Sequence, residues 1–223
     1  DLQGLLRSAL IGKLSISRKK LGRADGRELS TFFYRSIGDS SRKKEIHAIN
    51  RLTPFLSYLG VVEYNKKLPL DFLWDIDSFK ISEVPKNFIL LFPESRRQEK
   101  VWPYFQDLAS WITATYGQIV VVAGTGKNNE YQNCLDLRGQ IKLKELPLLI
   151  NKASLVVCND SAPLHLSSAL GVKLIALFGP TSTQRYGPYP SDQNQNFILN
   201  SDSSLIKDIE LKSVQDCVES ALG

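Results

Sequence analysis

Continuously apolar segments alternate with helix-like segments from residue 87 onward. The apolar runs are NFILLF (87–92), QIVVVA (118–123), SLVVC (154–158) and KLIALF (173–178). Strands that are apolar on both faces and alternate with helices are typical of a parallel sheet covered on both sides. The pattern therefore predicts a doubly wound α/β domain over residues 87–223, in which ligands bind at the carboxyl ends of the strands.

Helical spacing fills the intervals between these runs. The expected helices cover 103–116, a polar stretch at 128–137, 142–153, 162–170 and a closing helix within 204–223. Ser213 is a plausible N-cap for the closing helix. The short turn Gly124–Thr125–Gly126 is interpreted as a strand-to-helix connection.

Residues 1–70 show a different pattern. An amphipathic helix is expected over 2–14, helix-like stretches over 26–37 and 43–60, and one short strand near Leu21. We interpret this region as the second half of a separate domain, joined by a linker at residues 71–86 to the domain that follows.

Composition describes an ordinary globular chain. It has 223 residues, 43% of them hydrophobic, and a net charge of +5, which favours an anionic partner: a phosphorylated small molecule, nucleic acid or an acidic membrane surface. No apolar run is long enough to cross a bilayer, and the N-terminus lacks a secretory signal, so we expect a cytoplasmic protein. The chain starts within an apparent element and contains no Met, so we expect a fragment.

The three cysteines, Cys134, Cys158 and Cys217, are far apart and lack CxxC spacing. Neither a disulfide framework nor a zinc site is expected, and we interpret them as buried free thiols. No metal and no cofactor is predicted.

The sequence does not complete the known nucleotide-binding motifs or a hydrolase site. The segment AGTGKNN (123–129) lacks the first glycine and the Ser or Thr of a phosphate loop, and it lacks the third glycine of a dinucleotide fingerprint. A Ser-His-Asp hydrolase site built from Ser161, His165 and Asp160 is also disfavoured, because the nucleophile elbow GxSxG is absent.

A helix start directly after a buried strand is the informative feature. Asp160 or Ser161 is a suitable N-cap and Pro163 fits the first turn. Free backbone N–H groups and the helix dipole make such a start an anion site, to which His165 can add a donor. A capped helix with a structural histidine fits this stretch equally well.

Two other strand ends carry residues of the same kind. FGPT (178–181) ends the next strand, and PESRRQEKVWP (93–103) follows an earlier one. Arg96 and Arg97 fit a solvated loop equally well, whereas Lys100, just before Trp102, is harder to explain as surface charge. Hydroxyls, helix-start amides and cations around one crevice favour a diphosphate ligand.

These residues resemble a known family. NDSAPLHLSSALGVKLIALFGPT (159–181) resembles the D-[ST]-G-x-x-H-x-x-x-A…[FY]-G-P-T signature of glycosyltransferase family nine, the lipopolysaccharide heptosyltransferases. The segment ending KVWP, the opening DLQGLLRSAL, GRELSTFFYR and HAINR are also similar to that family. The resemblance implies a GT-B architecture of two Rossmann-like domains, the first incomplete in this chain, with the donor-binding domain at 87–223.

The resemblance also implies an activity and its partners. It implies an inverting, metal-independent transfer of heptose from ADP-heptose, or another nucleotide-diphosphate sugar, to a phosphorylated lipopolysaccharide core at the inner membrane face. Nucleic acid is not an implied partner. The family's general-base aspartate would lie in a segment that this chain lacks, so we expect the isolated chain to be inactive.

Site residues follow from the same resemblance. Lys100 is the implied catalytic residue, offsetting charge on the leaving diphosphate, with Ser95 also contacting the phosphates. Asp160 would hold sugar hydroxyls and Ile141 would lie against adenine. The remaining implied contacts are to the diphosphate (the Ser161 and Ala162 amides and His165) and to the acceptor (Arg27 and Arg51).

The sequence departs from the family pattern at two places in the donor domain. Ala162 replaces the signature glycine, so a loop that required positive φ would be strained. Asn128 stands where the family has a donor-facing carboxylate, with Glu130 as the nearest substitute. Two alternatives stay open: a non-catalytic nucleotide-sugar binding protein of the same fold, and a GT-B nucleotide-sugar epimerase.

Overall fold

The computed structural model describes residues 1–41, 46–64, 84–126, 130–190 and 196–223. It divides into two compact units: unit 1 comprises residues 1–65 and 184–186, and unit 2 comprises 66–183 and 187–223. The predicted linker, 71–86, lies outside the described residues apart from 84–86, and so does Asn128. The predicted domain boundary at residue 70 also falls there and stays a prediction.

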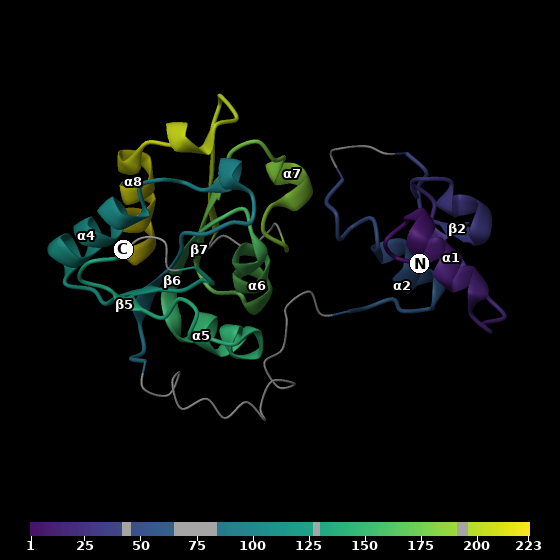
Figure 1. Ribbon diagram of the computed structural model, residues 1–223, viewed down its shortest axis with the longest axis horizontal. Helices are drawn as coiled ribbons and strands as arrows, with labels where there is room; N and C mark the ends of the chain where they lie inside the picture. The colour runs from purple at the N-terminus through teal and green to yellow at the C-terminus, as the bar shows by residue number, and fades with distance from the viewer. Residues whose placement is uncertain (42–45, 65–83, 127–129, 191–195) are drawn as a thin grey trace. The chain divides into compact units, whose positions relative to one another are not determined.

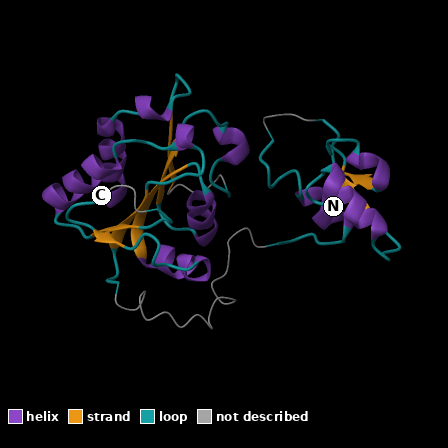
Figure 2. Ribbon diagram, viewed as in Figure 1, coloured by secondary structure: helices purple, strands orange, loops and turns teal. Residues whose placement is uncertain are grey.

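Unit 2 is built on a six-stranded sheet whose strands are all parallel (Figure 2). The spatial order is β5-β4-β3-β6-β7-β8. The strands are β3 (Phe88–Phe92), β4 (Val120–Val122), β5 (Leu135–Asp136), β6 (Ala153–Asn159), β7 (Leu174–Phe178) and β8 (Asn196–Asn200). The predicted parallel α/β sheet is confirmed, because its continuously apolar runs become strands buried on both faces.

Helices cover both faces of this sheet. Figure 1 shows α4 (Phe105–Tyr116) and α8 (Leu211–Leu222) on one side, and α5 (Leu146–Lys152) and α6 (Ala162–Leu170) on the other. The α4 and α8 side chains form one core cluster with alternate residues of the strands, such as Ile89 and Leu91 of β3. The shorter helices of this unit are η3 (Gln98–Lys100), η4 (Leu143–Glu145) and η5 (Ile206–Asp208).

The strand order places a topological switch point between β3 and β6. From β3 the chain proceeds through β4 to β5 on one side, then returns to β6 on the other side. The crevice outside the carboxyl ends of two such strands is where doubly wound folds bind ligands. Ligand binding is therefore expected at the loops that follow β3 and β6.

Two local predictions in unit 2 are wrong, and one strand was missed. The described part of the stretch 128–137, residues 130–137, contains no helix, and Leu135 and Asp136 pair with Val121 and Val122 as β5. The edge strand β8 was not predicted, because its exposed and polar positions weaken the apolar signal. The closing helix α8 begins after Glu210, so Ser213 lies inside its first turn and is not the N-cap.

Unit 1 contains α1 (Leu6–Leu14), β1 (Leu21–Arg23), η1 (Ser30–Phe33), β2 (Arg35–Ile37) and α2 (Thr53–Tyr58). The strand near Leu21 is confirmed, and α1 is shorter than predicted. The predicted helices at 26–37 and 43–60 are largely wrong, because β2 pairs in parallel with β1 and α2 begins only at Thr53, with Pro54 in its first turn. The helix α7 (Thr183–Tyr186) spans the boundary of the two units.

Candidate functional site

Lys100 and Asp160 meet at the switch point between β3 and β6. Lys100 ends η3 in the loop after β3, Asp160 follows β6, and Lys100 Nζ donates to Asp160 Oδ2 at 2.5 Å. The two side chains are only 14% and 6% exposed. A pair so shielded from water, formed by residues 60 positions apart, is positioned by the fold and is not a chance surface contact.

Thr181 completes this contact from the third strand end. Its Oγ1, in the loop after β7, donates to the same Oδ2 of Asp160. Asp160 Oδ1 has no hydrogen-bond partner within the described part of the chain, and it is not an enclosed atom. The protein thus holds one carboxylate oxygen of Asp160, Oδ2, through two side chains, and the predicted role of Asp160 in sugar binding stays a prediction.

Asn159 fixes the loop that carries Lys100. Its fully buried amide donates from Nδ2 to the Pro93 carbonyl at 2.9 Å and accepts the Trp102 backbone N–H at Oδ1 at 3.1 Å. Trp102 is itself anchored by its indole N–H, which donates to the Ile209 carbonyl at 2.8 Å. Both ends of the loop 93–102 are therefore tied to β6, a role that the sequence alone did not reveal.

At the start of α6 the Leu164 N–H bonds the Ser161 carbonyl and Pro163 has no N–H, so the amides of Ser161 and Ala162 are the ones that a ligand could use. Ser161 is the N-cap residue, as predicted, but its side chain makes no capping hydrogen bond; its Oγ donates to the Asn159 carbonyl instead. Pro163 lies in the first turn. Ala162 is not among the described residues with positive φ, so alanine replaces the signature glycine here without backbone strain.

The other predicted contacts of the diphosphate come from the loop after β3 and from α6. Ser95 is half-buried in the loop after β3, and His165 is exposed on α6 one turn from its start. Arg97 forms an exposed ion pair with Glu99 in the same loop. This favours the surface interpretation for Arg97 over a role in anion binding.

On the other side of β3, the structure reveals a carboxylate that the sequence analysis missed. Glu94 Oε2 accepts the Thr125 backbone N–H at 2.7 Å and its hydroxyl at 3.1 Å, and the Gly126 N–H lies 2.9 Å from both carboxylate oxygens. Glu130, the predicted substitute carboxylate, is exposed, and the hydrogen bonds to the described residues of this turn come from Glu94 instead. Ile141 is half-buried in the loop after β5.

A buried arginine just after β5 lies close to Glu94. Arg138 binds Asp136 through two hydrogen bonds, stacks 4.7 Å from the Tyr131 ring, and lies 4.0 Å from Glu94 Oε1. Hydrogen bonding to Asp136 raises the pKa of Arg138, and burial raises the pKa of Tyr131 to about 12. The positive charge of Arg138 is therefore held in place close to the Glu94 carboxylate.

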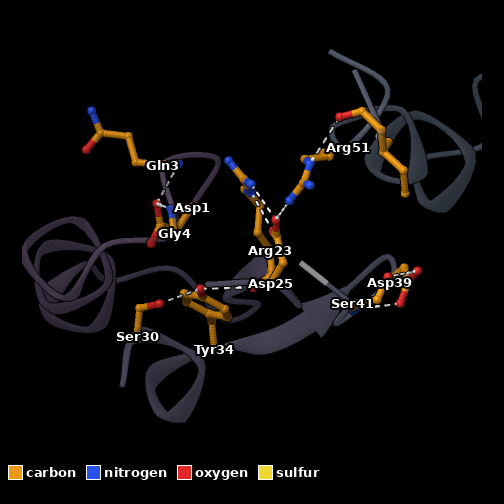
Figure 3. A network of polar contacts seen from close by, with 11 residues as sticks. Asp1, Gln3, Gly4, Arg23, Asp25, Ser30, Tyr34, Asp39, Ser41 and Arg51 are labelled. Carbon is orange, nitrogen blue, oxygen red and sulfur yellow. Dashed lines mark hydrogen bonds and ion pairs between the residues drawn. The ribbon is translucent and has the colours of Figure 1, made fainter. Parts of the chain in front are cut away.

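The two predicted acceptor arginines lie in unit 1 in different environments. Arg27 is exposed, whereas the Arg51 side chain is 7% exposed and donates to Asp25 at 2.5 Å (Figure 3). Arg23 binds the same carboxylate through two hydrogen bonds. These bonds, those from Arg23 foremost, lower the pKa of Asp25 to about 2.

The cysteines are free thiols, as predicted, but only Cys158 is fully buried, whereas Cys134 and Cys217 are half-buried. Burial raises the pKa of all three, that of Cys134 to about 11. Among the ranges that the structure describes, no three His, Cys, Asp or Glu side chains gather as a metal site, and no helix is long and apolar enough to cross a membrane.

Comparison with known sequences decides the family. The pattern described as glycosyltransferase family 9 (heptosyltransferase) matches residues 1–217. The chain belongs to this family. Lipopolysaccharide heptosyltransferase 1 of Campylobacter coli is 26% identical over 216 residues, which are 83% of this chain and 61% of that protein. Lipooligosaccharide heptosyltransferase 2 of Haemophilus influenzae is 34% identical over 109 residues, 42% of this chain and 31% of that protein.

Solved structures confirm the fold class, GT-B with Rossmann-like domains. The E. coli heptosyltransferase WaaC with ADP aligns with a TM-score of 0.77 at 19% identity, covering 98% of this chain and 71% of that one. In the sequence comparison, this family 9 chain spans 61% of the length of the Campylobacter coli relative. The resemblance seen in the sequence is confirmed, while the roles of individual site residues stay predictions.

Proposed function

We propose that this chain binds the donor in a heptosyltransferase reaction, the transfer of heptose from ADP-heptose to a lipopolysaccharide core. The observation that carries the proposal is the convergence of Lys100, Asp160 and Thr181, from three strand ends, at the switch point of unit 2. The relatives are named lipopolysaccharide heptosyltransferases, and two solved structures of E. coli WaaC contain ADP or an ADP-heptose analogue. Their names give the proposal its substrates.

The site offers the contacts that a sugar diphosphate needs. The amides at the start of α6 can bind phosphate oxygens, and the open oxygen of Asp160 can accept a hydrogen bond from a sugar hydroxyl. Lys100, held now by Asp160, can also neutralise a phosphate. When the bond between the anomeric carbon and the diphosphate breaks, negative charge grows on the leaving group, and a fixed ammonium lowers the energy of that state.

We propose that the transfer inverts the anomeric centre in one displacement and uses no metal, because the Lys100 ammonium supplies the positive charge that a metal ion would otherwise provide. An acceptor hydroxyl attacks the anomeric carbon and gives its proton to a base, while the nucleoside diphosphate departs. Within the acceptor half, the exposed Arg27 is the better candidate for a phosphorylated acceptor, because Arg51 is engaged with Asp25. Peripheral contact with a membrane belongs to this proposal as well.

Calorimetric titration with ADP-heptose, and with GDP- and UDP-sugars for comparison, tests the donor site. We expect ADP-heptose binding to weaken at least tenfold in Lys100→Ala, because one charge-assisted contact to phosphate is lost. Asp160→Ala should also weaken binding of the sugar nucleotide, but it should affect free ADP less.

Lys212→Ala is the matched control. Lys212 also pairs with an aspartate, Asp216, at 2.8 Å, but on the exposed surface of α8 with 67% of its side chain accessible. It should bind ADP-heptose as the unchanged chain does. Equal loss in Lys100→Ala and Lys212→Ala, or no binding of any nucleotide sugar at millimolar concentration, would contradict the donor-site proposal.

A further inference from the structure

The loop after β3 reaches both neighbouring strands. Lys100, near its end, contacts Asp160 on the β6 side, whereas Glu94, at its beginning, contacts the Gly124–Gly126 turn that follows β4. A ligand lying across the switch point therefore meets a cation and a helix start at one end and a fixed carboxylate at the other.

The turn after β4 is shaped around that carboxylate. Gly124 has a φ of +158°, and a Cβ placed on it would lie 2.7 Å from Glu94 Oε2. The Gly126 N–H and both donors of Thr125 point at the same group. Glycine at position 124 is what lets a side chain from another strand approach the backbone so closely.

Glu94 keeps capacity for a further donor. A carboxylate has about four acceptor positions, and Oε2 carries most of the contacts to the turn. Oε1 accepts the Gly126 N–H, while the Arg138 guanidinium stands 4.0 Å away. The side chain is 29% exposed, so a ligand hydroxyl can reach it.

We propose that Glu94 is the residue that recognises the ribose of the donor nucleotide. In the dinucleotide-binding folds that share this strand order, an acidic residue at the end of the second strand binds the ribose 2′-hydroxyl. The second strand here is β4, and the two residues that follow its last residue, Ala123 and Gly124, carry no carboxylate. Glu94 supplies one to the same place from β3.

This inference rests on the proposed donor site and adds a direction to it. The nucleoside lies over the β4 side, against Glu94, and the diphosphate and sugar lie over the β6 side, against Lys100 and Asp160. Glu130, which is exposed, then has no part in ribose binding.

Binding of ADP and 2′-deoxy-ADP, measured by calorimetry on the unchanged chain and on Glu94→Gln, tests the inference. The unchanged chain should prefer ADP about tenfold or more, because a hydrogen bond to a charged group is lost with the 2′-hydroxyl. In Glu94→Gln this preference should fall to about twofold or less. Glu130→Gln, a matched change of an exposed neighbouring carboxylate, should keep the full preference.

The inference would be overturned by an unchanged chain that binds both nucleotides equally, by a Glu94→Gln chain that weakens both by the same factor, or by a loss of preference in Glu130→Gln. The second result would mean that Glu94 only shapes the turn. Failure of the unchanged chain to bind ADP would overturn the proposed donor function together with this inference. Binding of ADP with an unaltered preference in Glu94→Gln would overturn this inference alone.

Discussion

Different kinds of interaction stabilise unit 1 and unit 2. In unit 2 every residue of β3, β4 and β7 is buried, and the side chains are apolar. In unit 1 large apolar side chains such as Leu14 and Ile16 are 86% and 102% exposed, while the Asp25 carboxylate is enclosed by Arg23 and Arg51. Apolar burial dominates one unit, and a few directional polar contacts dominate the other.

Leucine truncation in each unit gives the largest contrast. Leu155, in β6, is 0% exposed and Leu14, in α1, is 86% exposed. Leu155→Ala should lower the free energy of unfolding of unit 2 by about 4 kcal/mol, because it leaves a cavity in the core. Leu14→Ala should change stability by less than about 0.5 kcal/mol. Urea unfolding followed by the fluorescence of Trp102 and Trp111, both in unit 2, and by hydrogen exchange in unit 1 measures the two effects.

A loss above about 2 kcal/mol in Leu14→Ala would remove the contrast. It would mean that α1 buries this side chain in solution, and that unit 1 has an apolar core of its own. The same hydrogen-exchange data would locate that core, because protection would drop in the elements that pack against α1.

The second contrast concerns the polar cluster of unit 1. Asp25→Asn keeps the shape of the side chain but leaves the Arg23 and Arg51 guanidinium groups beside each other with their charge uncompensated. Breaking a buried pair in this way should cost about 3 kcal/mol. Hydrogen exchange of peptides that cover residues 20–40 should speed up accordingly, while peptides from β6 and β7 should not change.

Asp39→Asn is the control for the polar cluster, because Asp39 is an exposed carboxylate of the same unit that accepts hydrogen bonds from Ser41, only two positions away. Its effect should stay below about 0.5 kcal/mol. Equal effects of the two substitutions would show that the Asp25 cluster contributes no more than a surface contact.

The same difference explains which elements the sequence could predict. Apolar runs identified β3, β4, β6 and β7, because these strands are buried on both faces and their composition reflects that directly. The strand β2 was missed because its formation depends on tertiary contacts. A Cβ on Gly22 would lie 2.3 Å from the Tyr34 ring, so glycine in β1 makes room for the residue that precedes β2.

The residues of the candidate site also differ in whether the sequence could predict them. Lys100 and Asp160 belong to short ordered motifs, so their placement together was predictable from the sequence. Glu94 and Asn159 were missed, because their partners lie 31 residues and 57 or more residues away and no local pattern marks them. A side chain that bonds to distant backbone leaves no periodic signal in its own segment.

The smallest expected effect is the loss of stability at low pH, which concerns the polar cluster of unit 1. The hydrogen bonds from Arg23, opposed by burial and supported by those from Arg51, lower the pKa of Asp25 from 3.8 to about 2. A lowered pKa means that this stabilisation is complete above about pH 4 and is lost as the pH falls toward 2. The shift corresponds to about 2 kcal/mol.

Comparing the unchanged chain with Asp25→Asn at pH 5 and pH 2.5 isolates this contribution. General acid destabilisation acts on both proteins, whereas only the unchanged chain has the Asp25 carboxyl to protonate. The stability gap between them, measured by hydrogen exchange in residues 20–40, should therefore narrow by most of the expected 2 kcal/mol. A gap that stays constant would mean that the Asp25 pKa is ordinary, and that Arg23 and Arg51 do not hold unit 1 together through this carboxylate.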